Sequence, residues 1–308
     1  MSEREPWLDV IVVNFHSAPL LARTIAMVRE FAGAGARLIV VDNSPGDGAS
    51  AVARSADPDV TLIANRVNRG YAAAVNQALA VADGELVLLI NPDVRSISGS
   101  YADVLTAFAD PSVGTVAPRL VNRDGTLQPN CISTPRPFDL ISEDLALAER
   151  FPRWDRPRRY RMLDWDHRDA RRVDAARGAC LFIRGAALAD VGPFDEFFFV
   201  YYEETDWLIR AGRRGWRTAF LPTVQAVHDS AGSSPNVRSP HALLLLESQH
   251  RYSRKHFGAP ATALLRTALV GIDSARLARY ALAGRAAARA AAADRIRVHL
   301  TARAPRPS

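Results

Sequence analysis

The chain has 308 residues, of which 48% are hydrophobic and 23% charged, an ordinary composition for one large α/β domain or two smaller domains. The net charge of +6 is concentrated in residues 261–308, which hold nine arginines and two aspartates, so the nearly neutral remainder argues against nucleic-acid binding. The two cysteines exclude a disulfide framework, and the lack of a signal-peptide pattern or of a run of roughly 18 to 20 apolar residues predicts a cytoplasmic protein without membrane spans.

The first half of the chain alternates between short apolar runs, which predict strands, and segments with helical periodicity. The predicted strands are Val10–Phe15, Leu38–Val41, Val60–Ala64 and Leu86–Ile90, and the predicted helices are Ser17–Phe31, with Ser17 as N-cap, and Gly70–Ala82. Strands that are apolar on both faces and separated by helices are typical of an α/β fold with a mostly parallel sheet flanked by helices.

Polar residues close each of these strands: Asn14, Asp42, Asn65 and the triplet Asn91-Pro92-Asp93. In such sheets, ligands bind at the edge formed by the carboxyl ends of the strands. Asp93 and the neighbouring amide offer oxygen ligands for Mg²⁺ or Mn²⁺. Asn, Pro and Asp also favour plain turns, so the triplet is either a metal site or a strand-terminating turn.

In the second half of the chain, the alternation of predicted strands and helices stops and then resumes. Residues 122–177 are rich in Pro and Arg and have little periodicity, which indicates an insertion, a lid or a long solvated excursion. Residues 178–192 predict a strand and a short helix, residues 205–216 a helix, and residues 217–228 two strands about Pro222. The pattern is helical from His241 to about Leu300.

An acidic and aromatic segment, FDEFFFVYYEETDW, spans residues 194–207. Carboxylates against aromatic surface tend to have raised pKa values, which suits a general base, and Glu203, Glu204 and Asp206 are the candidates. The same three acids also fit the first turn of a helix, where the helix dipole favours negative charge. The bulky residues before them favour a walled pocket.

His228 ends the apolar run VQAVH and enters a loop of small residues. A lone histidine is more often structural than a ligand. This one lies at a strand end, however, where the ligands of such a sheet bind, so both interpretations stand.

Six stretches occur in a fixed order along residues 8–234: VIVVNFHS, LIVVDNSPGDG, NRGYAAAVNQAL, LLINPDV, the run from Gly178 to Pro222, and AVHDSAGSS. Together they resemble the inverting GT-A glycosyltransferases of family 2, and within them the bacterial rhamnosyltransferase-like members. The resemblance implies a Rossmann-like GT-A catalytic domain at 1–240, with a nucleotide-binding half at 8–120, an insertion at 121–177 and an acceptor and base half at 178–240. A basic helical extension follows at 241–308.

The resemblance also implies a role for several residues of the nucleotide-binding half. Asp42 corresponds to the strand-end acid that hydrogen-bonds the nucleotide base, and Asn14 and Phe15 line the same pocket. Arg69 is a further nucleotide contact.

Metal and base roles follow from the resemblance in the same way. Asp93 occupies the last position of the family's Asp-x-Asp motif, Asn91 replaces its first Asp, and His228 is the distant metal and diphosphate contact. Glu204 lies at the position of the family's catalytic base. That base is usually Asp, whose side chain is one methylene shorter than that of Glu, so Glu203 is kept as the alternative base.

The implied reaction transfers a sugar from a nucleotide sugar to a hydroxyl, with Mg²⁺ or Mn²⁺ neutralising the leaving diphosphate and a base on the opposite face giving inversion. The resemblance favours dTDP-L-rhamnose, with other dTDP- or UDP-sugars as alternatives, and a glycan, lipid-linked glycan or natural product as acceptor. A sugar-nucleotide nucleotidyltransferase needs a Gly-rich, Lys-bearing loop after its first strand, and VVNFHSAPLL has neither residue. A non-catalytic nucleotide- or nucleic-acid-binding protein is suggested only by the basic tail.

The tail predicts an amphipathic helix over residues 261–300. Its apolar face holds Leu264, Leu265, Ala268, Leu269 and Ile272, and its charge comes from Arg276, Arg279, Arg285 and Arg289. Such a helix either lies on the anionic inner face of the plasma membrane or packs on the catalytic domain or on the second subunit of a homodimer. A lipid-linked acceptor favours the membrane contact, whereas the stretch AAARAAAAD offers little apolar bulk for it.

Overall fold

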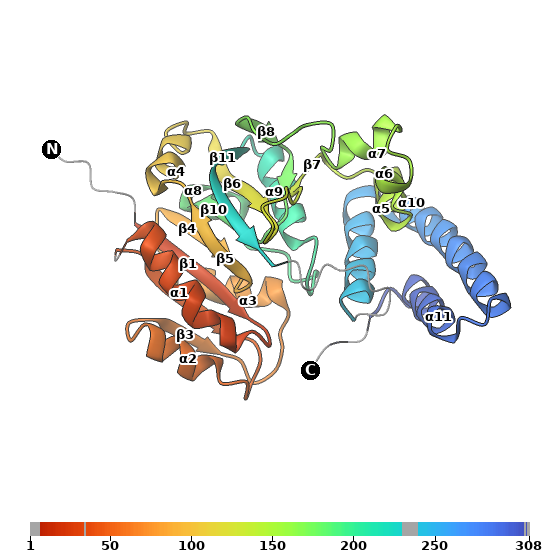
Figure 1. The fold of residues 1–308 in the computed structure, drawn as a ribbon, viewed down its shortest axis with the longest axis horizontal. Coiled ribbons are helices and arrows are strands. Elements are labelled where there is room, and N and C mark those ends of the chain that lie inside the picture. The colour runs from red at the N-terminus through yellow and green to blue at the C-terminus, as the bar shows by residue number, and fades with distance from the viewer. Residues whose placement is uncertain (1–6, 34, 230–239, 305, 307–308) are drawn as a thin grey trace.

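The computed structural model describes residues 7–33, 35–229, 240–304 and 306, which are built around one large sheet (Figure 1). Its strand order is β3-β2-β1-β4-β10-β6-β11-β5. Four parallel strands form one end of the sheet: β1 (Leu8–Asn14), β2 (Arg37–Asp42), β3 (Thr61–Ala64) and β4 (Leu86–Ile90). The predicted fold class, a helix-flanked α/β sheet with a C-terminal helical extension, is confirmed.

Helices cover both faces of the sheet because strand residues are apolar on both sides. One core cluster joins Val10 and Val12 to α1 (Ala18–Ala32), α2 (Ala49–Ala56) and α4 (Tyr101–Ala107). The other joins Ile11 and Val13 to α3 (Tyr71–Leu79), α8 (Gly185–Val191) and α9 (Glu203–Arg213). All four β1 side chains are buried, and burial of each contributes about 1.5–3 kcal/mol.

The other end of the sheet is mixed. β10 (Cys180–Arg184) runs antiparallel between β4 and β6 (Val113–Val121), with Cys180 opposite Ile90. β11 (Arg217–His228) is parallel to β6 and antiparallel to β5 (Val94–Ser98). The expectation of two strands about Pro222 was wrong: β11 is one strand of 12 residues, whose register with β6 shifts between Leu221 and Gln225. The irregularity accommodates a proline that cannot donate a ladder hydrogen bond.

Residues 121–177 contain several short elements. They are β7 (Cys131–Ile132), α5 (Pro137–Asp144), α6 (Leu147–Arg150), α7 (Asp155–Tyr160), β8 (Arg171–Val173) and β9 (Ala175–Ala176). β8 pairs with β11 in the main sheet, and β7 pairs with β9 in a separate ladder. Leu140 is fully buried, so this segment supplies core and sheet as well as surface.

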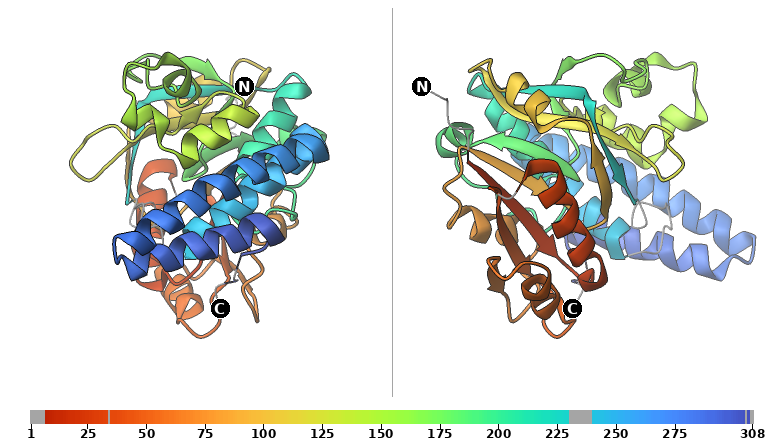
Figure 2. Two further views of the ribbon diagram at one scale, coloured as in Figure 1. Left: turned by 90° about the vertical axis from the view of Figure 1, so that its right-hand side faces the viewer. Right: turned by 60° about the vertical axis from the view of Figure 1, so that its left-hand side comes forward.

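The C-terminal region forms a helical hairpin of α10 (Pro240–Leu282) and α11 (Ala286–Thr301). The two helices lie side by side and project beyond the sheet (Figures 1 and 2). α10 bends at Gly258, where φ is +80°. Among the described residues, no helix combines the length and apolarity needed to cross a membrane.

The predicted apolar face of the tail packs mainly inside the protein. Leu265 and Leu269 are buried in a cluster with Leu140 of α5 and Val298 of α11, whereas Leu264 is 74% exposed. The alternative in which the helix packs on its own chain therefore accounts for most of this face.

A polar core joins the two arms of the hairpin. Asp273 is fully buried and accepts hydrogen bonds from Arg276 (2.8 Å), Arg295 (2.8 Å) and His299 (2.9 Å). Burial opposes its ionisation, but these partners lower the pKa of Asp273 to about 2. His250 lies 2.9 Å from the other nitrogen of His299, and burial, aided by neighbouring cationic groups, lowers the pKa of His250 to about 3. Arg276, expected at the surface, is thus part of this core.

Candidate functional site

The end of β1 forms a polar junction with β2, because Asn14 and Asp42 are register partners. Asn14 is fully buried; its amide nitrogen donates to Asp42 Oδ1 (3.1 Å) and Asp47 Oδ2 (2.9 Å). Its amide oxygen accepts from the backbone N–H (3.1 Å) and the hydroxyl (2.9 Å) of Ser17. Asn14 therefore ties three segments together, and Ser17 precedes α1 as predicted but uses its hydroxyl on Asn14 rather than on the helix.

The carboxylate of Asp42 is fixed by its neighbours. It also accepts from the backbone N–H of Ser44 (3.1 Å) and the hydroxyl of Ser50 (2.8 Å), and it is 5% exposed. Phe15 is half-buried and Arg69 is exposed. Both side chains are thus accessible to a ligand at this edge, unlike the carboxylate of Asp42.

A set of amides holds the loop that carries Arg69. Asn43 is buried; its Nδ2 donates to Asn68 Oδ1 (2.9 Å), and its Oδ1 accepts from Asn65 Nδ2 (3.1 Å) and the backbone N–H of Arg69 (3.0 Å). Asn65 also exchanges two hydrogen bonds with Gln77 of α3. The sequence analysis noted Asn65 but missed Asn43, although its place directly after Asp42 at a strand end was a usable signal.

The ends of β4 and β11 bring Asp93 and His228 together. The backbone oxygen of Asp93 accepts from the N–H of Asp229 (3.0 Å), and His228 Nε2 lies 3.3 Å from Asp93 Oδ1. That carboxylate oxygen is buried and has no hydrogen-bond partner within the described parts of the chain. Asn91 shapes the turn through its backbone, since its N–H donates to the oxygen of Ala179 (2.9 Å). A buried carboxylate oxygen without a donor, next to an imidazole nitrogen, suits a bound cation.

Asp229, which follows His228 in the chain, is already paired and does not serve as a further metal ligand. It forms ion pairs with Arg123 and Arg95, whose hydrogen bonds lower the pKa of Asp229 to about 2 against the effect of burial. Within the described part of the chain, no group of three or more His, Cys, Asp or Glu side chains could hold a metal. A cation at Asp93 and His228 therefore needs further oxygens from a ligand or from water. Residues 230–234 of the AVHDSAGSS stretch lie outside the described residues.

Glu203 and Glu204 begin α9, after a turn in which Tyr201 and Tyr202 have φ values of 69° and 68°. Such left-handed conformations cost on the order of 1–3 kcal/mol each in residues other than glycine, so the surrounding packing must hold them. The Oε2 atoms of both glutamates are buried, and no residue that the structure describes hydrogen-bonds to them. Gly178 packs directly on Glu204, because a Cβ added there would lie 3.2 Å from Glu204 Cγ.

The two glutamates differ in charge environment. Burial raises the pKa of both, and the charge of Glu204 raises that of Glu203 further. Glu204 instead receives a backbone N–H from Gly178 and the field of Arg177, which favour its ionised form. Of the two, Glu204 therefore has the environment that better supports a negative charge, whereas the environment of Glu203 favours the protonated form. Arg177, which pairs with Glu143 at 2.9 Å, was missed by the sequence analysis although it directly precedes the GACLFIR run.

Tyr71 connects the two acidic sites. Burial, followed by the charges of Glu203, Glu204 and Asp93, raises the pKa of Tyr71, and the same causes raise the pKa of Tyr201 to about 12. All three carboxylates therefore lie in one neighbourhood at the carboxyl edge of the sheet.

Asp206, the third acid of the EETD run, has different partners. It is fully buried and accepts from Lys255 Nζ (2.7 Å), His256 Nε2 (2.8 Å) and Arg210 Nε (2.9 Å). Burial acts against its ionisation, but these bonds lower the pKa of Asp206 to about 2. This carboxylate is poorly suited to take a proton, and it anchors α9 to α10.

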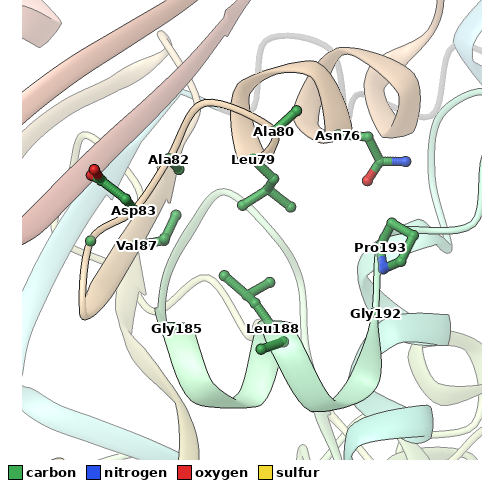
Figure 3. A pocket seen from close by; sticks show the side chains of 12 residues that line it. Asn76, Leu79, Ala80, Ala82, Asp83, Val87, Gly185, Leu188, Gly192 and Pro193 are labelled. Atoms are coloured by element: carbon green, nitrogen blue, oxygen red, sulfur yellow. The ribbon is translucent and has the colours of Figure 1, made fainter.

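A cavity of about 560 Å³ lies away from these residues (Figure 3). It is lined mainly by small and apolar side chains of α3, β4, α8 and the loops beside them, among them Leu79, Ala80, Val87 and Leu188. It lies near the start of β4, whereas Asp93 follows the end of that strand. The candidate site is thus defined by its side-chain chemistry rather than by this cavity.

Solved glycosyltransferases share this fold. The mannosyltransferase PcManGT from Pyrobaculum calidifontis, solved with GDP-Man and Mn²⁺, matches with a TM-score of 0.52 and 21% identity, covering 98% of this chain and 86% of that chain. GalNAc-T7, solved with UDP, GalNAc and Mn²⁺, matches with a TM-score of 0.51 and 13% identity, covering 73% of this chain and 44% of that chain. The chain thus has the GT-A fold of these solved proteins.

Sequence comparisons give the family. The profile of glycosyl transferase family 2 matches residues 9–176, somewhat more than half of the chain. An N-acetylglucosaminyl-diphospho-decaprenol L-rhamnosyltransferase of Mycobacterium tuberculosis is 29% identical over 76% of this chain and 80% of its own length. The low-salt glycan biosynthesis hexosyltransferase Agl10 of Haloferax volcanii is 24% identical over 77% and 72%. The chain belongs to glycosyl transferase family 2, and its rhamnosyltransferase-like character is confirmed.

Proposed function

We propose that this enzyme is a divalent-metal-dependent, inverting hexosyltransferase that moves a sugar from a nucleotide sugar to a hydroxyl acceptor. The observation that carries the proposal is the shared neighbourhood of the carboxyl groups of Asp93, Glu203 and Glu204 around Tyr71, with His228 3.3 Å from Asp93. A cation-binding pair next to a general base meets the two needs of the transfer, because charge builds on the leaving diphosphate while the acceptor loses a proton.

The donor nucleotide would lie against the ends of β1 and β2. Asp42 would accept a hydrogen bond from the base, with Asn14 holding it in place, and Phe15 and Arg69 would contact the nucleotide. We favour dTDP-L-rhamnose, supported by the Mycobacterium tuberculosis relative named as an L-rhamnosyltransferase. Other dTDP- and UDP-sugars are the alternatives.

The residues present fit Mg²⁺ or Mn²⁺. Asp93 offers a buried oxygen that accepts no hydrogen bond from residues 7–33, 35–229, 240–304 or 306, His228 offers a ring nitrogen next to it, and Asn91 would shape the turn between them. When bound, the ion supplies positive charge that stabilises the leaving diphosphate. The two solved structures named above were obtained with Mn²⁺, which supports the choice of ion.

Glu204 would act as the base. It would accept the proton of the acceptor hydroxyl as that oxygen bonds to the anomeric carbon, while the bond from this carbon to the diphosphate oxygen breaks and its electrons leave with the diphosphate. One displacement from the face opposite the leaving group inverts the anomeric centre. Glu203 would stay protonated beside Glu204, and Asp206 would keep α9 docked on α10 rather than take part in proton transfer.

A lipid-linked glycan is our preferred acceptor, ahead of a free glycan or a natural product, because the mycobacterial relative is named for a decaprenol-linked substrate. The enzyme would then work in the cytoplasm at the inner face of the plasma membrane. The tip of the helical hairpin is the candidate contact: Leu282 is 92% exposed and Arg279, Arg285 and Arg289 surround it in sequence. A homodimer through the same surface is the alternative, and we propose no nucleic-acid partner.

A donor panel tests the function. Nucleotides and nucleotide sugars are screened by thermal shift with and without Mn²⁺, because a ligand of the native state raises Tm, and the best donors are then offered to lipid-linked and free acceptors. The proposal requires a metal-dependent shift with one class of nucleotide sugar and release of the nucleoside diphosphate. Release of pyrophosphate from a nucleoside triphosphate and a sugar phosphate would instead reveal a nucleotidyltransferase. Binding without any turnover would reveal a non-catalytic protein.

We retain the division into a catalytic domain at 1–240 (8–120, 121–177 and 178–240) and an extension at 241–308.

A further inference from the structure

A directed chain of side-chain hydrogen bonds ends on the imidazole of His228. Gln128 Oε1 lies 2.7 Å from His228 Nδ1, and Gln128 Nε2 donates to Asn122 Oδ1 (3.2 Å). Asn122 Nδ2 in turn donates to the hydroxyl of Thr126 (2.9 Å), which donates to Asp124 Oδ1 (2.6 Å). Because a carboxylate only accepts, every donor in this chain points towards Asp124. The amide oxygen of Gln128 must therefore be the atom that faces His228.

An amide oxygen can only accept, so it selects the His228 tautomer with hydrogen on Nδ1. In the neutral imidazole, Nε2 is then left with a lone pair, and it lies 3.3 Å from Asp93 Oδ1, a buried oxygen that has no hydrogen-bond donor among the described residues. Two acceptors at this separation repel each other unless a positive charge lies between them. The chain of hydrogen bonds thus prepares both atoms to hold a cation.

The turn that carries Gln128 is itself fixed by the backbone. Asn122 N–H donates to the oxygen of Thr126 (2.9 Å), Gly125 N–H to the oxygen of Asn122 (3.0 Å), and Gln128 N–H to the oxygen of Leu120 (2.9 Å). Gly125 supplies the φ of +79° that closes the turn. The turn lies at the start of the segment that the sequence analysis treated as an insertion, so this segment reaches the metal side of the site.

We propose that Gln128 is a positioning residue: through the turn at 122–128, it holds His228 in the Nδ1–H tautomer that presents Nε2 to the metal of the donor complex. The inference rests on the metal site of the proposed function. Outer-shell partners of this kind typically change metal affinity by about 10- to 100-fold. Gln128 would contact neither donor nor acceptor.

The test compares Mn²⁺ affinity, measured on the full-length protein by electron paramagnetic resonance with and without dTDP, for wild type, Gln128→Leu and Gln128→Glu. The leucine variant should bind Mn²⁺ about 10- to 100-fold more weakly, whereas the glutamate variant keeps an accepting oxygen and should retain most of the affinity. Gln225→Leu is the matched control, because Gln225 lies on the same strand as His228 but is hydrogen-bonded to Arg119. Its affinity should equal that of wild type.

A second measurement reads the tautomer directly. Long-range ¹⁵N–¹H spectra, with the His228 signals assigned by their loss in His228→Ala, should show Nδ1–H in wild type and a shift away from it in Gln128→Leu. Normal Mn²⁺ binding and an unchanged tautomer in a folded Gln128→Leu protein, with binding lost in Asp93→Ala, would overturn this inference alone. Normal binding in Asp93→Ala as well would overturn the metal site of the proposed function and this inference together. Were the leucine variant to unfold, Gln128→Glu and Asn122→Ala would carry the same comparison.

Discussion

Exchanging Glu203 and Glu204 separately for glutamine separates their roles, because the two side chains lie in different charge environments. Glu204→Gln removes the proposed general base, and loss of a general base typically costs about 10²- to 10⁴-fold in rate, or about 2.7–5.5 kcal/mol of transition-state stabilisation. Glu203→Gln places a neutral amide of the same shape where the environment favours a protonated carboxyl. We expect it to cost less than about tenfold, or about 1.4 kcal/mol.

The assay is single-turnover transfer at saturating donor, with donor binding measured separately by calorimetry. Both variants should bind donor like wild type. Glu196→Gln is the control, because Glu196 is an exposed acid of the same segment and pairs with Asn76. The wild-type rate should fall as the pH drops through the raised pKa of Glu204, since only its ionised form accepts a proton. A larger loss in Glu203→Gln than in Glu204→Gln, or no large loss in either, would refute this assignment.

Four further predictions use other parts of the molecule. Asp93→Ala should abolish transfer and the effect of Mn²⁺ on donor binding; near-normal turnover would make Asp93 a turn residue only. Asp206→Asn should lower the free energy of unfolding by about 3 kcal/mol or more, because it leaves buried cationic partners unpaired, whereas Asp155→Asn, at an exposed ion pair, should change it by less than about 1 kcal/mol. The pKa of His250 is about 3 in the folded protein and near its ordinary 6.5 in the unfolded chain. The free energy of unfolding therefore has its full value above pH 6.5 and falls below it, by on the order of 2 kcal/mol at pH 5. Denaturant unfolding of His250→Gln should lack this part of the pH dependence. Leu282→Glu should reduce salt-sensitive co-sedimentation with anionic liposomes, and unchanged sedimentation would argue against hairpin contact.

The parallel half of the sheet was predictable because each of its strands is a short run of apolar residues with a polar end. β6 was not, since its sequence VGTVAPRLV contains Gly114 and Pro118, which are unfavourable inside a strand. Tertiary pairing with β10 and β11 on either side compensates for them. Strand β5 has the sequence VRSIS, which contains too few apolar residues to be predicted as a strand.

The site residues divide in the same way. Asp42, Asp93 and His228 lie at strand ends, where chain order and local pattern indicate a ligand edge. Asp206 could not be told from Glu204 in the sequence, because its cationic partners come largely from α10, about 50 residues further along the chain. The role of Gln128 could not be predicted for a related reason: its partner, His228, is 100 residues away in the chain.

The register between β4 and β10 constrains which parts of this chain can change in length. Ile90 lies opposite Cys180, and the N–H of Asn91 bonds the oxygen of Ala179, so the turn that ends in Asp93 and the glycine that packs on Glu204 leave the sheet side by side. One residue added to or removed from either exit would shift one acid against the other by about 3.3 Å and turn it to the opposite face. Insertions and deletions in related sequences should therefore be found in surface loops such as 151–154, where every residue is exposed, and be excluded from 90–93 and 178–180, and loop grafts between relatives should respect these two short spans.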